Sequence, residues 1–178
     1  LNFTDPNSLA AQTAASTFRK GVAMLAQRYI AGESTEQILK TIERLRRHQM
    51  AFTIDLLGEA VISEAEAQSY QQRYLDLLAT LSQAAQNWQR VPAIDTAEGE
   101  DLPKVQVSVK LTAFYSQFDP LDPEGSREKV CERVRPLLRR AQELGAAIHF
   151  DMEQYVYKDL TLAILKDLLM EEEFRDRA

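Results

Sequence analysis

The segment VQVSVKLTAFYSQFD (Val105–Asp119) begins with seven residues that alternate between apolar and polar. Because successive side chains of a β-strand point to opposite faces, this alternation predicts a strand with one valine-rich face and one polar face. The polar face carries Gln106, Ser108 and Lys110, and the lysine comes last, beside a loop. A lysine near a buried strand end needs a partner for its charge, so the surroundings of Lys110 decide how the chain is interpreted.

Two further segments show the same alternation. They are AFTIDLLG (51–58), which is short and ends at a glycine, and AAIHFDME (146–153). Helical segments separate the three strands, and strands that are joined by helices pair in parallel because the chain must cross back between them. The polar residues of the two segments are Thr53, Asp55, His149, Asp151 and Glu153.

Apolar residues that recur every three or four positions predict helices around these strands. The sequences STEQ (Ser34–Gln37) and SEAE (Ser63–Glu66) have the form of capping boxes, which satisfy free backbone donors at a helix start. Gly32 is expected to end the first helix. Residues 89–104 are rich in proline, glycine and acidic residues without any period, so a loop is expected there. The expected helices cover residues 8–31, 34–48, 63–88 and 127–144, and a last segment that contains Leu160 and Leu169.

This order divides the chain into a helical arm at residues 1–48 and three strand–helix units at residues 49–178. Three such units form either half of an open doubly wound sheet or the first part of an eight-stranded barrel. In an open sheet, helices cover both faces, so the strands are apolar on both. Here each strand keeps one polar face, which favours a barrel whose mouth holds a polar ligand at the C-terminal strand ends. Lys110 and Asp151 lie at such ends.

Lys110 can act in three ways at that position. Paired with an anion, it is a receptor for a carboxylate or phosphate; without its proton, it is a Schiff-base nucleophile. It can also form a structural ion pair with Asp151 that only fills the barrel mouth. His149 is interpreted as an interior residue with satisfied hydrogen bonds. No second histidine or cysteine stands at metal-ligand spacing, so no metal site is predicted.

The composition limits the function further. The chain has 178 residues, of which 45% are apolar and 27% charged, values typical of a folded domain. Its net charge of −6 argues against a nucleic-acid-binding protein. The single cysteine, Cys131, is expected to pack on a helix and suits a reducing compartment. No apolar run could span a membrane, and the first residues lack the features of a signal peptide, so a cytoplasmic protein is expected.

Three motifs resemble successive strand-end motifs of the flavin-dependent proline dehydrogenase family. They are FTIDLLGEAVISEAEA (Phe52–Ala67), VSVKLTAFYSQF (Val107–Phe118) and IHFDMEQY (Ile148–Tyr155), and they occur in the family's order. The likeness is greatest to the proline dehydrogenase domain of bacterial bifunctional proline-utilisation enzymes, and it extends from Phe18 onward. The resemblance implies a distorted (βα)8 TIM-type barrel that binds FAD, oxidises L-proline to Δ1-pyrroline-5-carboxylate and passes electrons to a quinone.

The resemblance also implies roles for individual residues. Lys110 matches a family lysine that helps to hold the substrate carboxylate, and Asp151 matches an aspartate near the substrate amine and the flavin. Met152 is expected to lie against the flavin. Glu59 matches a glutamate that pairs with a substrate-binding arginine and closes the pocket.

The sequence departs from the family pattern at two points. Its third motif reads DMEQ where the family has a DAEE-like sequence, so Gln154 stands at the last position. The chain also ends before the family's flavin-binding strands and paired arginines. The expected fold is therefore α/β, with N-terminal helices followed by three βα units of a truncated barrel. Such a fragment is expected to be inactive and to self-associate through its open sheet edges. The parent enzyme is expected to make at most peripheral contact with the inner membrane.

Two other functions remain open. A class I aldolase-type barrel would use Lys110 as a Schiff-base nucleophile, with Asp151 handling protons, and borohydride would trap its adduct with a carbonyl substrate. A non-catalytic module would use the helical arm and the acidic residues 95–101 for assembly within a larger enzyme.

Overall fold

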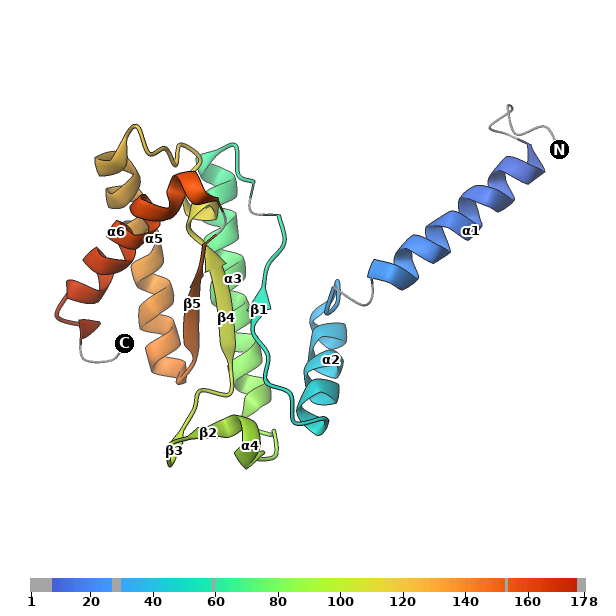
Figure 1. The fold of residues 1–178 in the computed structure, drawn as a ribbon, viewed down its shortest axis with the longest axis horizontal. Coiled ribbons are helices and arrows are strands. Elements are labelled where there is room, and N and C mark those ends of the chain that lie inside the picture. The colour runs from blue at the N-terminus through green and yellow to red at the C-terminus, as the bar shows by residue number, and fades with distance from the viewer. Residues whose placement is uncertain (1–7, 27–29, 59, 153, 176–178) are drawn as a thin grey trace. The chain divides into compact units, whose positions relative to one another are not determined.

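The structure, a computed structural model, describes the chain as two compact units, Leu1–His48 and Gln49–Ala178. The first unit contains α1 (Leu9–Ala26) and α2 (Thr35–Arg47). The second unit contains the parallel sheet on which the candidate site is built (Figure 1). The described residues are 8–26, 30–58, 60–152 and 154–175.

The start of α2 confirms the first predicted capping box. The Ser34 hydroxyl accepts a hydrogen bond from the backbone N–H of Gln37 at 3.4 Å, and the Gln37 side chain accepts one from the N–H of Glu33 at 2.9 Å. The predicted end of the first helix at Ala31 is wrong, because α1 ends at Ala26 and Ala31 is not helical. Gly32 instead permits a close approach, since a Cβ there would lie 2.6 Å from the Cβ of Gln37.

The second unit repeats a strand and a helix three times, as predicted. The strands of its sheet have the order β1-β4-β5, and both pairs are parallel. A short antiparallel pair, β2 with β3, follows α4. The elements in chain order are β1 (Ile54–Asp55), α3 (Glu64–Ala85), α4 (Pro92–Asp95), β2 (Thr96–Ala97), β3 (Glu100–Asp101), β4 (Gln106–Lys110), the 3-10 helix η1 (Leu111–Phe114), α5 (Pro123–Leu144), β5 (Ala147–Asp151), the 3-10 helix η2 (Tyr155–Tyr157) and α6 (Lys158–Met170).

The register of the sheet separates its two faces. Ile54, Val107 and Ile148 pair in one row, so the apolar residues of the three strands share a face. Lys110 pairs with Asp151 in the last row, on the opposite, polar face. The predicted segregation of apolar and polar faces is therefore confirmed.

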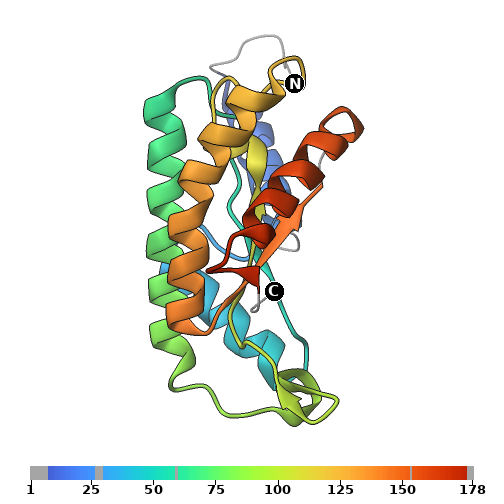
Figure 2. The same ribbon diagram turned by 90° about the vertical axis from the view of Figure 1, so that its left-hand side faces the viewer.

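Helices α3 and α5 lie side by side over the apolar face (Figures 1 and 2). The core forms between them and the sheet because their inward-facing side chains are apolar at helical spacing. α6 packs on α5 from the other side (Figure 2). The largest fully buried side chains of this core are Tyr74, Leu78, Leu81, Val107, Val109, Phe114, Val130, Val134, Leu137, Ile164 and Leu168.

Local signals explain the ends of α3 and α5. Ser63 accepts a hydrogen bond from the N–H of Glu66 at 3.3 Å, so the second predicted capping box is confirmed. Asp122 caps α5 through the N–H of Gly125 at 3.1 Å, which starts this helix four residues before the predicted Arg127. Gly145 ends α5 as predicted, with a left-handed φ of 62° that glycine adopts at low cost.

Two sequence predictions for this unit are wrong in extent. Residues 51–58 form a strand only at Ile54 and Asp55. Residues 89–104 are not a plain loop, because α4 and the β2–β3 hairpin lie within them. Asp95 explains the second difference: it is buried, and its carboxylate accepts a hydrogen bond from the N–H of Val91 at 2.7 Å. The acidic, aperiodic composition of residues 89–104 gave no signal for this short helix and hairpin.

Candidate functional site

The C-terminal ends of the three parallel strands bring a lysine between two aspartates. Lys110 ends β4, while Asp55 ends β1 and Asp151 ends β5. The Lys110 ammonium donates a hydrogen bond to Oδ2 of Asp55 and forms an ion pair with it. On the other side, the Lys110 Nζ lies 3.6 Å from Oδ2 of Asp151. The structure thus places Lys110 and Asp151, both singled out from the sequence, in one cluster.

The three members of this cluster differ in exposure. The Lys110 side chain is 11% exposed, the Asp55 side chain 28% and the Asp151 side chain 45%. Removing an ammonium group from water is costly unless opposite charge compensates for it, and the two carboxylates provide that compensation. Asp151 is therefore the member that solvent, or a ligand, reaches most easily.

Tyr74 of α3 contacts Asp55, and the neighbouring Tyr70 contacts the residue that follows it. The Tyr74 hydroxyl lies 3.1 Å from Oδ1 of Asp55 and 2.9 Å from the carbonyl oxygen of Ser108. It accepts a hydrogen bond from the N–H of Leu56 at 3.5 Å, and Tyr70 donates one to the carbonyl of Leu56. Burial raises the pKa of Tyr74 far above its usual range, so the phenol keeps its proton and remains a donor.

An aromatic cluster connects these tyrosines to the segment that follows Lys110. The ring centroids of Tyr70 and Tyr74 are 5.1 Å apart in a T-shaped arrangement. Phe114 of η1 stacks on Tyr74 with the centroids 5.9 Å apart. Such pairs add to the stability that burial provides, so the packing defines where the Tyr74 hydroxyl lies.

The loop after η1 is fixed by a carboxylate at the start of α3. Oε1 of Glu64 accepts hydrogen bonds from the N–H of Ser116 at 3.0 Å and from its hydroxyl at 2.7 Å. Arg133 of α5 donates to Oε2 of Glu64 and to the carbonyl of Phe114, both at 2.7 Å. The hydrogen bond from the Ser116 side chain, followed by the bond from its backbone and the charge of Arg133, lowers the pKa of Glu64 below its ordinary value.

The other residues singled out from the sequence lie in different situations. Met152 follows β5 and is 46% exposed, beside Asp151. Glu59 lies outside the described residues. The interpretation of His149 as an interior residue is wrong, because it is exposed and its Nε2 bonds to Oε1 of Gln106 at 2.9 Å. The polar face of β5 is open in the described part of the chain, so alternation alone did not imply burial.

Asp55 is the site residue that the sequence interpretation did not assign. The alternation that points to Lys110 and Asp151 also places Asp55 on a polar strand face. The available signal was its place at the end of the first strand, since parallel strand ends meet at one edge. What was missing was the register, which places Asp55 beside Ser108 and thereby within reach of Lys110.

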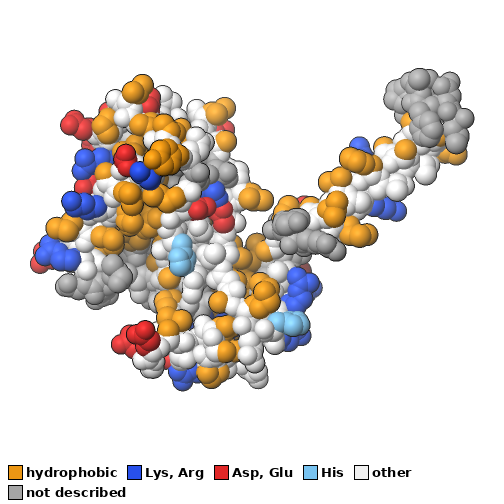
Figure 3. Space-filling view, in the orientation of Figure 1, with side chains coloured by type: hydrophobic (Ala, Val, Ile, Leu, Met, Phe, Trp, Pro, Cys, Tyr) orange, Lys and Arg blue, Asp and Glu red, His pale blue; other side chains and the backbone are white. Residues whose placement is uncertain are grey.

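Hydrophobic side chains surround the exposed end of β5. Met152, Tyr155 and Val156 are all exposed, although each is largely apolar. Figure 3 shows hydrophobic side chains gathered over α6 and the neighbouring end of the sheet. Beside the charged cluster there is thus apolar surface that a flat organic ring could cover.

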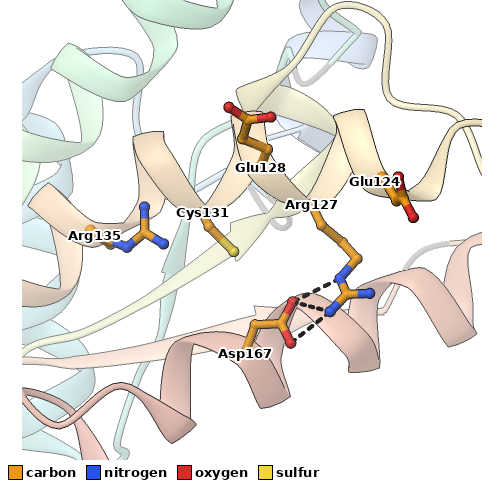
Figure 4. Close-up of a pocket in the computed structure, with 6 residues that line it drawn as sticks. All are labelled: Glu124, Arg127, Glu128, Cys131, Arg135 and Asp167. Atoms are coloured by element: carbon orange, nitrogen blue, oxygen red, sulfur yellow. Dashed lines mark hydrogen bonds and ion pairs between the residues drawn. The ribbon is translucent and has the colours of Figure 1, made fainter.

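A surface hollow of about 460 Å³ lies between α5 and α6 (Figure 4). Arg127 donates hydrogen bonds to both carboxylate oxygens of Asp167 at 2.7 and 2.8 Å, and Arg135 pairs with Glu171 at 2.9 Å. Cys131 is buried there, as predicted, and burial raises the pKa of its thiol. Both arginines are paired and the thiol stays protonated, so this hollow has the character of a helix–helix contact.

The described residues contain neither a metal-binding cluster nor a membrane-spanning helix. No group of three or more His, Cys, Asp or Glu side chains there could hold a metal ion. None of the helices in those ranges is long and apolar enough to cross a membrane.

Comparisons with known proteins agree on one family. Residues 38–178 match the family model described as proline dehydrogenase. Proline dehydrogenase 1 of Bacillus subtilis (strain 168) is 27% identical over 151 residues, which are 85% of this chain and 42% of that protein. The bifunctional protein PutA of Salmonella typhimurium is 23% identical over 171 residues, or 94% of this chain and 12% of that protein.

A solved structure supports the same fold. The chain is similar to proline utilization A (PutA) from Bdellovibrio bacteriovorus, inactivated by N-propargylglycine, with a TM-score of 0.90 and 40% identity over 94% of this chain and 17% of that one. PutA from Corynebacterium freiburgense gives a TM-score of 0.65 at 25% identity. The chain therefore spans less than half of the length of each relative described here, and within that part the predicted barrel fragment is confirmed.

Proposed function

Because the chain belongs to the proline dehydrogenase family, we propose that its second unit supplies one side of a site that oxidises L-proline to Δ1-pyrroline-5-carboxylate. The observation that carries this proposal is the cluster of Lys110 between Asp55 and Asp151 at the ends of the three strands. It lies within the residues that match the family model, and catalytic groups of such barrels lie at this edge of the sheet.

The geometry suggests how the cluster would bind an amino acid. It holds two carboxylates and one ammonium group, so its field favours the cationic amine of proline. Asp151 is the more exposed carboxylate and is the natural partner for that amine. Lys110 keeps the carboxylates together and lies where it can help to hold the substrate carboxylate. Glu59 is proposed to close the pocket by pairing with an arginine supplied from elsewhere in the protein.

The residues present fit one edge of a flavin. The exposed Met152 offers apolar surface, and the neighbouring Asp151 offers a hydrogen-bond acceptor. The chemistry that FAD supplies when bound is the acceptance of the hydride that leaves the proline ring, and a quinone is the proposed final acceptor. Because the chain spans only 12–42% of the curated relatives described above, we expect it to lack activity by itself.

The proposal extends to the surroundings of the site. Residues 1–48 would form an arm used for assembly, and the edges of the three-stranded sheet would pair with another copy when nothing else covers them. The one cysteine suits a cytoplasmic location, with at most peripheral contact with the inner membrane.

The pairing of Lys110 argues against the Schiff-base alternative. A nucleophilic lysine must give up its proton, which here would leave Asp55 and Asp151 facing each other without the cation between them. Borohydride treatment of the chain with carbonyl compounds is therefore expected to trap no adduct at Lys110.

A segment exchange tests the proposed function. Residues 38–178 replace the matching segment of PutA from Bdellovibrio bacteriovorus, and proline-dependent reduction of a dye is measured. The chimera is expected to be active, and Lys110→Met to lower its kcat/KM by about 100-fold, because a fixed charge at the reacting centre is lost. Lys129→Met is the matched control, since Lys129 pairs with Glu132 on the outer surface of α5. A folded, flavin-loaded chimera without activity, or equal activity of the two variants, would contradict the proposal.

A further inference from the structure

Strand β1 is held to the sheet by an unusually short ladder. It pairs with β4 only at Ile54 and Asp55, whereas β5 pairs with β4 over five residues. Two residue pairs fix the direction of a strand weakly, and the side chain of its last residue even less. Asp55 nevertheless makes the closer of the two carboxylate contacts with Lys110. Groups outside the ladder must therefore hold it.

The contacts of Tyr74 supply that support. Its hydroxyl has one proton, which two acceptors share: Oδ1 of Asp55 at 3.1 Å and the carbonyl of Ser108 at 2.9 Å. One acceptor is a side chain of β1 and the other a main-chain group of β4, so a single hydroxyl ties the two strands together. The bond to Asp55 uses Oδ1, which leaves Oδ2 for the Lys110 ammonium.

The position of this hydroxyl is itself well defined. Tyr74 is fully buried, and its ring packs against Tyr70 and Phe114. A buried ring in contact on two sides has little freedom to turn, so its hydroxyl is a fixed point toward which the Asp55 carboxylate orients.

We propose that Tyr74 is a positioning residue, which orients the Asp55 carboxylate and through it fixes the Lys110 ammonium at the strand ends. The proposal rests on the proposed function in so far as Lys110 serves proline oxidation. It adds a residue on α3, remote from the open face of the sheet, to those on which that reaction depends.

Tyr70 provides a matched control. It lies one turn before Tyr74 on α3, is almost equally buried, and belongs to the same aromatic cluster. Its hydroxyl donates to the carbonyl of Leu56 and also interacts with the Tyr74 side chain, so it reaches Asp55 only through Tyr74. Tyr70→Phe and Tyr74→Phe therefore each remove one buried hydroxyl that bonds to the segment at the end of β1, but only the second removes the direct bond to Asp55.

The first test uses this chain without any substrate. A lysine ammonium held by fixed carboxylates exchanges slowly with water and gives a sharp 1H–15N signal, which the Lys110→Met variant assigns by its absence. Tyr74→Phe is expected to abolish the Lys110 signal, and Tyr70→Phe to retain it, with both variants folded by circular dichroism. Retention of the signal in both variants, or its loss in both, would overturn the proposal.

The second test measures catalysis in the PutA chimera. Tyr74→Phe is expected to lower kcat/KM by about tenfold through misplacement of Lys110, and Tyr70→Phe to leave it within about twofold. Equal effects of the two substitutions would refute a positioning role. If the chimera is inactive before any substitution, the proposed function fails but the role of Tyr74 does not. That role is still decided by the ammonium signal of Lys110 in the isolated chain.

A third measurement needs no variant and covers the case in which Tyr74→Phe does not fold. In the unaltered chain, the hydroxyl proton of Tyr74 should exchange slowly enough to be observed, and it should show nuclear Overhauser contacts with the β-protons of Asp55. A slowly exchanging proton without those contacts would place the hydroxyl elsewhere and refute the proposal.

Discussion

Strands β1 and β5 flank the same lysine, but they present their aspartates in different ways. β5 is held by a five-residue ladder and places Asp151 directly opposite Lys110, yet Asp151 stays 3.6 Å from the ammonium and is 45% exposed. β1 has two paired residues, and its Asp55 is closer to the ammonium and 28% exposed. Packing from α3, rather than the length of the ladder, decides how firmly each side chain is held.

The largest expected effect compares Ile54 with Ile148. Both are isoleucines that pair with Val107 in the same row of the sheet, but Ile54 is buried whereas Ile148 is half-buried. Ile54→Ala should lower the free energy of unfolding by about 3 kcal/mol, because it leaves a cavity under α3. Ile148→Ala should cost about 1 kcal/mol, because less apolar area is lost. Urea unfolding measures both, and equal costs would mean that β5 is as well packed as β1.

The next effect compares the loss of the Asp55 carboxylate with the loss of the Asp151 carboxylate. Asp55→Asn removes the closer of the two carboxylate contacts of the 11% exposed Lys110, and should lower the unfolding free energy by about 2 kcal/mol. Asp151→Asn should cost about 0.5 kcal/mol, in the range of exposed ion pairs. The same urea titrations test this order. The reverse order would show that the ladder of β5, and not α3, stabilises the cluster.

A smaller effect concerns the turn into β5. Gly145 has a φ of 62°, a backbone conformation that is strained for alanine. Gly145→Ala should therefore lower the unfolding free energy by about 1 kcal/mol. Gly145→Asn is the control and should cost less, because asparagine tolerates this conformation. Thermal unfolding of the three proteins gives the comparison. A neutral Gly145→Ala would indicate that the turn can shift, and that its geometry does not set the position of β5.

The smallest effect depends on pH and involves the loop on the α3 side. The pKa of Glu64 is lowered from 4.5 in the folded protein, so its contribution to stability is present above that pH and is lost as the pH falls through the folded pKa. Glu64→Gln should therefore destabilise the protein at neutral pH, by less than about 1 kcal/mol for this half-exposed pair, and much less in acid. Unfolding curves over a pH series check this, and a constant difference at every pH would exclude an ionic contribution.

The sequence predicted the features that depend on local periodicity. The alternation in Gln106–Lys110 gave both the strand and its polar face, and the hydroxyl and carboxylate of Ser63 and Glu66 marked the start of α3. These features were accessible because each depends on residues within one turn or one strand of each other.

The predictions that were wrong or incomplete concern features that depend on tertiary contacts. Asp55 could be assigned to a face but not to Lys110, because a distance between strands requires their register. Asp95 belongs to a segment with the composition of an acidic loop, yet it is buried and accepts a hydrogen bond from the N–H of Val91. His149 was placed in an interior, yet the polar face of β5 is open in the described ranges. In each case the burial and the partners of the residue depend on its neighbours in the folded chain.

The buried Cys131 has a practical consequence. Its thiol sits at the contact of α5 with α6, and its raised pKa keeps it unreactive while that contact is closed. A thiol reagent would have to enter the hollow between α5 and α6 to reach this thiol, so its labelling rate depends on how tightly the two helices pack. Since these 178 residues contain one cysteine, the labelling rate of this chain reports on a single place in the fold. The chain thus carries its own probe for changes in the contact between α5 and α6, and no foreign label has to be introduced.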